Sequence, residues 1–220
     1  MDIRGAPTMD GERIRLRDYL RRNTDALHRQ LHHMPVFRRM SEGDLSAGSY
    51  RALMISLRDF YWHLDPEIER AITTYGHELD YGSYQPRFPF LAADVRALNG
   101  PPERAPRPRQ NTNGRMAVTI RDLPSLIGVL YVVDGSMLGG AAINRLARAI
   151  CPSETPYGRS YWQWCAKHGP LRWKATLGTI DASPSTDAFR EKSLQAARVT
   201  FTALQAELQA ETSNREAVAS

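Results

Sequence analysis

"DGSMLGGAAINRL", residues 134–146, lies inside a long apolar stretch whose pattern predicts a helix, yet it contains three glycines, and Gly128 lies seven residues before Gly135. Each glycine in a helix interior costs about 1 kcal/mol relative to alanine, so four forfeit about 4 kcal/mol of a typical stability of about 5–15 kcal/mol. Either a neighbouring helix crosses closely here, or the backbone lies against a flat ligand. Gly128, Gly135 and Gly139 fall on nearly one helix face, which suits both explanations and also tolerates a kink.

The overall composition is that of a globular protein with a basic balance. The chain has 220 residues, of which 42% are hydrophobic, enough for one domain with a substantial core. Lys and Arg outnumber Asp and Glu by 29 to 24, which gives a formal charge of +5. The basic residues are spread along the chain without an aromatic-interleaved block, so we expect an acidic partner or an anionic ligand and no nucleic acid.

Cysteine usage and the absence of targeting signals favour a cytoplasmic protein. Cys151 and Cys165 are the only cysteines and have no metal-binding spacing, so we expect two free thiols in a reducing compartment. The N-terminal segment lacks the apolar core of a signal peptide. No uninterrupted apolar run is long enough to span a bilayer, so we expect no membrane segment.

Apolar residues recur at helical spacing along the chain, and no segment alternates as a strand does, so the expected fold is all-α. The expected helices cover residues 12–34, 46–75, 90–100 and 122–150, a tryptophan-rich segment from about 154 onward, and residues 185–210. Pro66 is expected to bend or split the second helix, and Gly100 to end the third.

We expect these helices to form a single domain over residues 11–210. Residues 1–10 and 211–220 are expected to be disordered. The segment rich in Pro, Arg and Asn at about 100–115 is expected to be a surface loop. It does not separate two domains, because neither side carries enough apolar segments for a core of its own.

The first expected helix carries a row of polar residues along one face. His28 lies four residues after Thr24 and seven after Arg21. Three leucines flank this row with apolar surface: Leu20, Leu27 and Leu31. His28 and His32 have a spacing that suits zinc, but no glutamate completes an HExxH motif. We therefore expect His32 and His33 to be solvated.

The polar row and the glycine-rich stretch together resemble the heme oxygenase family. "TDALHRQL", residues 24–31, is similar to the segment that carries the axial histidine of that family, and "LYVVDGSMLGG", residues 130–140, is similar to its distal-helix signature. The second motif is most similar to bacterial members associated with bacteriophytochromes. The resemblance covers about residues 14–210. It implies a single-domain helical bundle with heme between a proximal helix and a kinked, glycine-rich distal helix.

The resemblance implies roles on both faces of the heme. His28 would bind the iron through a neutral imidazole nitrogen. Gly135, Gly139 and Gly140 would form the distal surface against the heme, and Ser136 would hold a water network beside the oxygen site.

The resemblance also implies contacts at the edge of the heme. Arg21, Tyr131 and Arg198 match positions that contact the heme carboxylates, and Thr24 joins them through its place in the same row. Asp134 departs from the glutamate usual in the bacterial motif. The side chain at that position either supports packing outside the pocket or anchors a basic residue. The basic loop 101–109 has no counterpart in the family pattern.

The resemblance implies an enzyme that converts heme, both substrate and cofactor, to biliverdin, carbon monoxide and ferrous iron with O2 and external electrons. The sequence carries no flavin or nucleotide fingerprint, so the electrons would come from a separate reductase or an acidic donor such as a ferredoxin. Biliverdin could then supply a bacteriophytochrome. The sequence predicts neither which ring carbon is attacked nor the oligomeric state.

Three alternatives stay open. A non-catalytic heme carrier or sensor would need the same His28 and glycines. A structural protein could bind an acidic partner through its basic face. A non-heme diiron oxidase would need carboxylates and histidines that converge from several helices. Its nearest candidate ligands are His63, Glu67, Glu69 and His77, but Asp65–Pro66 interrupts their helix and no second Glu-x-x-His motif is present.

Overall fold

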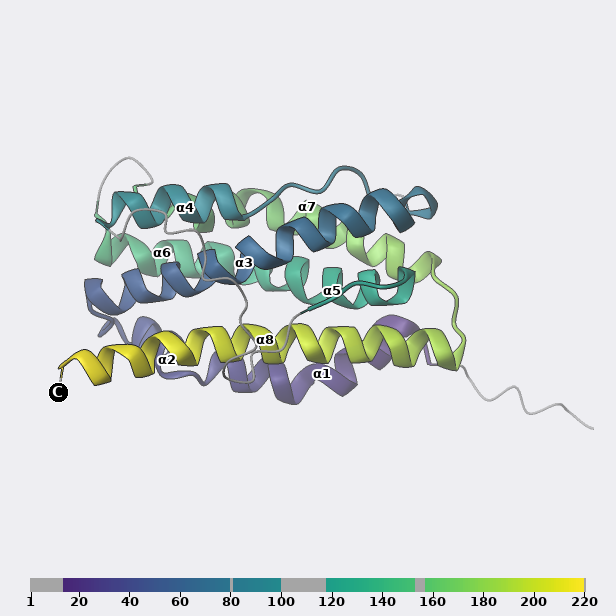
Figure 1. The fold of residues 1–220 in the computed structure, drawn as a ribbon, viewed down its shortest axis with the longest axis horizontal. Coiled ribbons are helices and arrows are strands. Elements are labelled where there is room, and N and C mark those ends of the chain that lie inside the picture. The colour runs from purple at the N-terminus through teal and green to yellow at the C-terminus, as the bar shows by residue number, and fades with distance from the viewer. Residues whose placement is uncertain (1–13, 80, 100–117, 153–156, 220) are drawn as a thin grey trace, which may run out of the picture.

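Every element in the described part of the chain is a helix, which confirms the all-α class (Figure 1). The computed structural model describes residues 14–79, 81–99, 118–152 and 157–219. Its elements are α1 (Leu16–His32), α2 (Pro35–Glu42), α3 (Ala47–Tyr75), η1 (Gly76–Glu78), α4 (Phe88–Ala97), α5 (Leu123–Ser136), η2 (Met137–Gly139), α6 (Gly140–Ile150), α7 (Ser160–Ala182) and α8 (Asp187–Ala219). The predicted N-terminal disorder at 1–10, the helix stop at Gly100 and the loop at 100–115 lie outside the described residues.

The helix boundaries differ from the prediction at two places, and at Pro66 the structure excludes one of the two expected outcomes. Pro35 begins α2, which the sequence did not predict, because a proline suits the first turn of a helix as well as it ends one. Pro66 does not split α3, which is helical from Ala47 to Tyr75. The helix α8 continues to Ala219, where we expected a disordered tail from 211, since each added residue extends a helix that is already nucleated.

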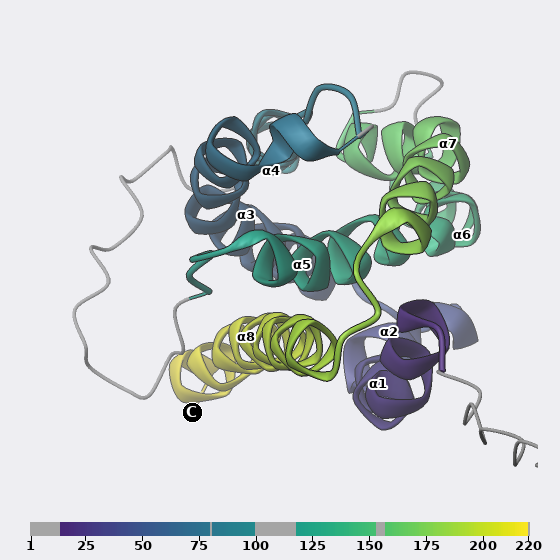
Figure 2. The same ribbon diagram turned by 90° about the vertical axis from the view of Figure 1, so that its right-hand side faces the viewer.

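The helix α8 supports both α1 and α5. Figure 2 shows α8 and α1 on one side of α5, with α4 and α7 on the other. An apolar cluster joins α1, α5, α7 and α8, and its buried members are Leu16, Leu20, Ile127, Val132, Ile180, Leu194, Ala197 and Phe201. The positions of α1 and α5 are therefore both set by packing against α8.

The apolar stretch Leu123–Ile150 corrects one expectation from the sequence. It is 28 residues long with a mean hydropathy of 1.7 in its most apolar part, so by length and composition it could cross a membrane. We expected no such run, because Asp134 and the glycines interrupt the apolar sequence, but they do not interrupt the helical stretch. Burial inside the protein covers 56% of that apolar part, as in the core helix of a globular fold.

Two of the four glycines allow helices to cross closely. A Cβ at Gly128 would lie 2.1 Å from the carbonyl oxygen of Ser193 on α8. A Cβ at Gly140 would lie 2.5 Å from the Cβ of Cys165 on α7. No side chain fits at such distances, so close helix packing accounts for these two glycines.

Buried carboxylates hold the first turns of α4 and α7. Asp65 on α3 accepts hydrogen bonds from the backbone N–H groups of Arg87 and Phe88, both at 2.7 Å, where α4 begins. Asp94 on α4 does the same, at 2.8 Å each, for two N–H groups where α7 begins. Burial raises the pKa of both carboxyls, while these hydrogen bonds oppose the shift. Each carboxylate satisfies N–H groups that have no partner within their own helix, and so fixes α3, α4 and α7 relative to one another.

A buried ion pair ties α5 to the segment before α4 and to α7. Arg87 and Asp134 are both fully buried, and Nη2 of Arg87 donates to Oδ1 of Asp134 at 2.5 Å. The other carboxylate oxygen accepts from the hydroxyls of Tyr81 at 2.7 Å and Thr176 at 2.6 Å. Asp134 thus anchors a basic residue, one of its two expected roles, although this arginine lies in the core.

Three aromatic rings lie close to the guanidinium group of Arg87. The guanidinium carbon of Arg87 lies 5.5, 4.9 and 5.8 Å from the ring centroids of Tyr61, Tyr84 and Trp164. Cation–π attraction at these faces offsets part of the cost of burying the charge.

Gly128→Ala should destabilise the fold, because the added methyl group overlaps backbone atoms of α8 that cannot rotate away. We expect the free energy of unfolding, measured by urea denaturation, to fall by about 1–3 kcal/mol. Gly178→Ala on α7 is the matched control, since its Cβ would meet nothing within 4 Å. That change should raise stability by about 1 kcal/mol through helix propensity alone. Equal effects of the two substitutions would contradict the packing explanation.

Asp134→Asn should lower the free energy of unfolding by about 3–5 kcal/mol, because it leaves the buried charge of Arg87 without its counter-ion. Asp122→Asn is the control on the same helix. Asp122 is partly exposed and pairs with Lys192 at 2.8 Å, so losing that charge should cost at most about 1 kcal/mol, and asparagine still caps the helix. Chemical denaturation of both variants compares them; a loss at Asp134 no larger than at Asp122 would refute the anchoring role.

Candidate functional site

Three of the predicted edge residues meet where α1 faces α5. The Tyr131 hydroxyl of α5 interacts with the Thr24 hydroxyl and with the charge of Arg21, both on α1. Burial raises the pKa of Tyr131, while Thr24 and the nearby arginines oppose that shift. Thr24 is itself buried and donates to the carbonyl oxygen of Leu20 at 2.8 Å. The hydroxyls of Tyr131 and Thr24 thus lie near each other between α5 and α1.

His28 and Gly135 lie one turn beyond that contact. His28 follows Thr24 by four residues, and Gly135 follows Tyr131 by four. Because α1 and α5 run in the same direction (Figure 1), we infer that the two residues lie at similar levels along the two helices.

His28 is exposed on α1 yet partly desolvated by its neighbours. Its ring centroid lies 6.3 Å from that of Phe201 on α8 and 4.5 Å from that of His32. Burial lowers the pKa of His28, the charge of His32 lowers it further, and Asp25 acts in the opposite direction. The imidazole is therefore held neutral near pH 7, the form that can bind a metal ion.

The α-helical pattern is interrupted at the glycines, where the resemblance implies a kink. The helix α5 ends at Ser136, the 3-10 turn η2 follows, and α6 begins at Gly140. A Cβ at Gly135 would meet the ring of Trp173 at 3.4 Å, and one at Gly139 would meet only Ile143 Cδ1 at 3.8 Å. Both are ordinary contact distances, so packing within the protein does not require glycine at these two positions. The backbone of Gly140 instead faces α7.

Two side chains of this segment, Ser136 and Leu138, lie at the surface, whereas Met137 between them is buried. Ser136 is exposed, and its hydroxyl donates to the carbonyl oxygen of Val133 at 2.8 Å. Its oxygen remains able to accept a hydrogen bond from water. Leu138 is a large apolar side chain with 49% of its surface exposed. The exposed Leu138, next to Gly139, offers apolar surface to a ligand.

Arg198 lies apart from the Tyr131 contact, on the exposed side of α8. It is one turn before Phe201, and its charge acts on Tyr19 of α1, whose hydroxyl donates to Glu191 at 2.9 Å. The structure therefore places Arg198 at the contact between α1 and α8.

The sequence did not identify Trp173, Phe201 or His32 as site residues. The ring of Trp173 lies 5.6 Å from that of Tyr131 and also contacts Gly135. Phe201 was expected to be part of the core, and His32 to be solvated. Only the tryptophan-rich composition of α7 and the spacing of His28 and His32 could have indicated them.

The described residues fit a flat apolar group that carries a metal ion and carboxylates. His28 offers a neutral ligand, Gly135 and Gly139 carry no side chain over their backbone, and Arg21 beside Tyr131 offers a cation and a hydroxyl. A heme has these three features: an iron atom, an apolar ring and two carboxylates at one edge.

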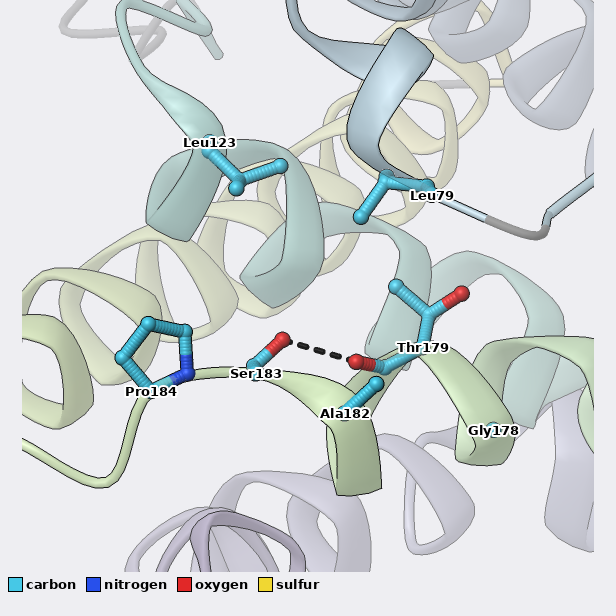
Figure 3. A pocket seen from close by; sticks show the side chains of 7 residues that line it. All are labelled: Leu79, Leu123, Gly178, Thr179, Ala182, Ser183 and Pro184. Atoms are coloured by element: carbon cyan, nitrogen blue, oxygen red, sulfur yellow. Dashed lines mark hydrogen bonds between the residues drawn. The ribbon is translucent and has the colours of Figure 1, made fainter.

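A small cavity elsewhere in the fold is separate from this site. It has a volume of about 100 Å³ and is lined by Leu79, Leu123, Gly178, Thr179, Ala182, Ser183 and Pro184 (Figure 3). The Ser183 hydroxyl donates to the carbonyl oxygen of Thr179 at 2.7 Å. The volume is below the range of about 300–1,000 Å³ usual for larger ligands. Leu123 lies about 18 Å along the helix from Gly135, at 1.5 Å per residue.

The diiron alternative finds no ligand cluster in the part of the chain that the structure describes. Among those residues, no group of three or more His, Cys, Asp or Glu side chains could hold a metal ion. Asp65 caps α4, and Glu67 pairs with Arg70 at 2.9 Å. Cys151 and Cys165 are buried and free, and burial raises the pKa of Cys165 to about 12.

Comparison with known proteins identifies a matching family and a matching fold. The heme oxygenase family profile matches residues 14–210. The structure of heme oxygenase from Leptospira interrogans superposes with a TM-score of 0.64 and 19% sequence identity, covering 88% of this chain and 98% of that one. At that identity the likeness shows a shared fold. No curated protein matches the sequence. Because the family profile spans nearly the whole chain, the protein belongs to the heme oxygenase family.

Proposed function

We propose that the protein is an active, cytoplasmic heme oxygenase that cleaves heme to biliverdin, carbon monoxide and ferrous iron, using O2 and electrons from a separate donor. The observation that carries the proposal is the placement of neutral His28 and half-buried Gly135 at similar levels of α1 and α5, one turn beyond Tyr131 and Thr24. This arrangement offers a metal ligand on one side and bare backbone on the other.

Each residue of the site would have a specific role in that reaction. Bound heme supplies the iron that activates O2 and the ring that is oxidised. His28 would hold the iron through its neutral imidazole. Gly135 and Gly139 let backbone approach the other side, so the space above the ring stays narrow. Ser136 can hold water there as a proton carrier, without a strong acid.

The edge residues orient the substrate. Arg21 offers a charged donor and Tyr131 a hydroxyl to the heme carboxylates. Two carboxylates held at one edge prevent the ring from rotating, so the same ring carbon would face the kink in each turnover.

An acidic electron donor fits the charge of α1. Arg17, Arg21 and Arg22 are exposed, and none has an ion pair among the described residues. Attraction between this surface and an acidic ferredoxin would speed association at low salt. Delivery of biliverdin to a bacteriophytochrome stays a prediction of the family resemblance.

His28→Ala should remove the axial ligand and turnover together. We expect activity with ascorbate or ferredoxin in air to fall by more than the roughly 10–100-fold typical when only a partner of a metal ligand is lost. Absorbance spectra would follow the Soret band on hemin addition, its decay to a bilin band, and ferrous iron captured by a chelator. His33→Ala, at the end of the same helix, should behave as the wild type. Unchanged turnover in His28→Ala would refute the assignment. A stable Soret band in the wild type would instead favour the heme carrier.

Gly139→Leu should fill the open space beside the kink without disturbing the fold. The added side chain should weaken hemin binding about tenfold or more, since overpacking costs about 1–3 kcal/mol and 1.4 kcal/mol is tenfold. Hemin titration and urea denaturation measure the two effects separately. Ala149→Leu, an exposed position near the end of α6, is the control and should change neither. Wild-type hemin affinity in Gly139→Leu would show that this backbone does not face the ligand.

A further inference from the structure

The two exposed imidazoles of His28 and His32 converge on one point. The residues are four apart on α1, and their Nε2 atoms lie 3.2 Å from each other. Their ring centroids are 4.5 Å apart, with an angle of 70° between the ring planes. Both side chains lie at the surface. The Nε2 atoms of the two rings are therefore close together, on side chains exposed to solvent.

This separation matches two ligands of a single metal ion. Histidine nitrogen atoms bind zinc at about 2.0–2.1 Å, so two nitrogen atoms 3.2 Å apart subtend an angle of about 100° at a shared ion. That angle is close to the tetrahedral value and to a cis pair in a square site. Little rearrangement of the two rings is required beyond loss of their mutual hydrogen bond.

The surroundings set the class of ion. Imidazole nitrogen favours zinc and copper over calcium or magnesium. Asp25, one turn before His28, adds negative charge nearby, although its carboxylate already pairs with Arg29 at 2.6 Å. Within the described residues no third side chain completes a ligand set, so water would fill the remaining positions. His33 lies about 100° further round the helix than His32, outside the pair.

We propose that His28 and His32 together form a binding site for a divalent transition-metal ion of the zinc and copper class in the heme-free protein. The site takes the ion through the two Nε2 atoms. An ion held there occupies the nitrogen of His28 that the heme iron would otherwise bind. Metal ion and heme therefore exclude each other; this second part rests on the proposed function, whereas metal binding does not.

Isothermal titration of the heme-free, full-length protein with Zn²⁺ tests the site. We expect one ion per chain in the wild type. In His32→Ala, binding should weaken at least about tenfold, since half of the protein ligands are gone. His33→Ala is the matched control, because it removes a neighbouring exposed histidine of the same helix. Unchanged binding in His32→Ala, or an equal loss in His33→Ala, would overturn the proposal.

Hemin titration in the presence of Zn²⁺ tests the competition. Zn²⁺ should weaken hemin binding to the wild type and to His33→Ala, but not to His32→Ala, which keeps the heme ligand. A one-to-one zinc site without any hemin binding would support the metal site and refute the proposed function. Hemin binding that Zn²⁺ leaves unchanged, with no zinc bound, would overturn the metal site alone.

Discussion

The ion pair between Arg87 and Asp134 fixes the backbone on which the rest of the site depends. Asp134 directly precedes Gly135, and its carboxylate is held from the core side by a buried cation and two hydroxyl groups. Any displacement would leave a buried charge without its partner, in surroundings that solvate it poorly. The backbone at the end of α5 is therefore held from the core side, next to two glycines whose positions could accept a Cβ without a clash. The backbone at Gly135 is therefore rigid, and no side chain of its own covers it.

The two sides of the proposed heme site are carried by different helices that share one support. The helices α1 and α5 both pack on α8, and they touch each other through Tyr131 and Thr24. Their separation at the level of His28 therefore follows mainly from the way in which both helices pack on α8. The ring of Phe201 on α8 lies beside that of His28, so α8 also contacts α1 at this level. The chain thus positions a metal ligand without a direct link between the ligand and the glycines.

The fold was largely predictable because helical periodicity and caps such as Asp122 are local signals. The predictions that failed depended either on tertiary contacts or on sequence signals with two possible meanings. Pro35 was taken as a helix end, although proline also begins helices. The four glycines are indistinguishable in sequence, because only the structure shows whether the space beside each is filled by another helix. Trp173 of α7 contacts Tyr131 of α5, and a contact between two distant helices cannot be predicted from a local sequence pattern. The alignment of His28 with His32 was visible as a spacing, but the direction of the rings was not.

The glycines of α5 and α6 are subject to two different evolutionary constraints. Gly128 and Gly140 are required by neighbouring backbone, so selection preserves them for as long as the protein must fold. Gly135 and Gly139 face no such obstacle, so selection preserves them only while a ligand uses the space beside them. A lineage that ceased to use the ligand would acquire side chains at 135 and 139 while retaining 128 and 140. The pattern of drift at these positions among diverged descendants would then distinguish lineages that still use the ligand from those that keep only the scaffold.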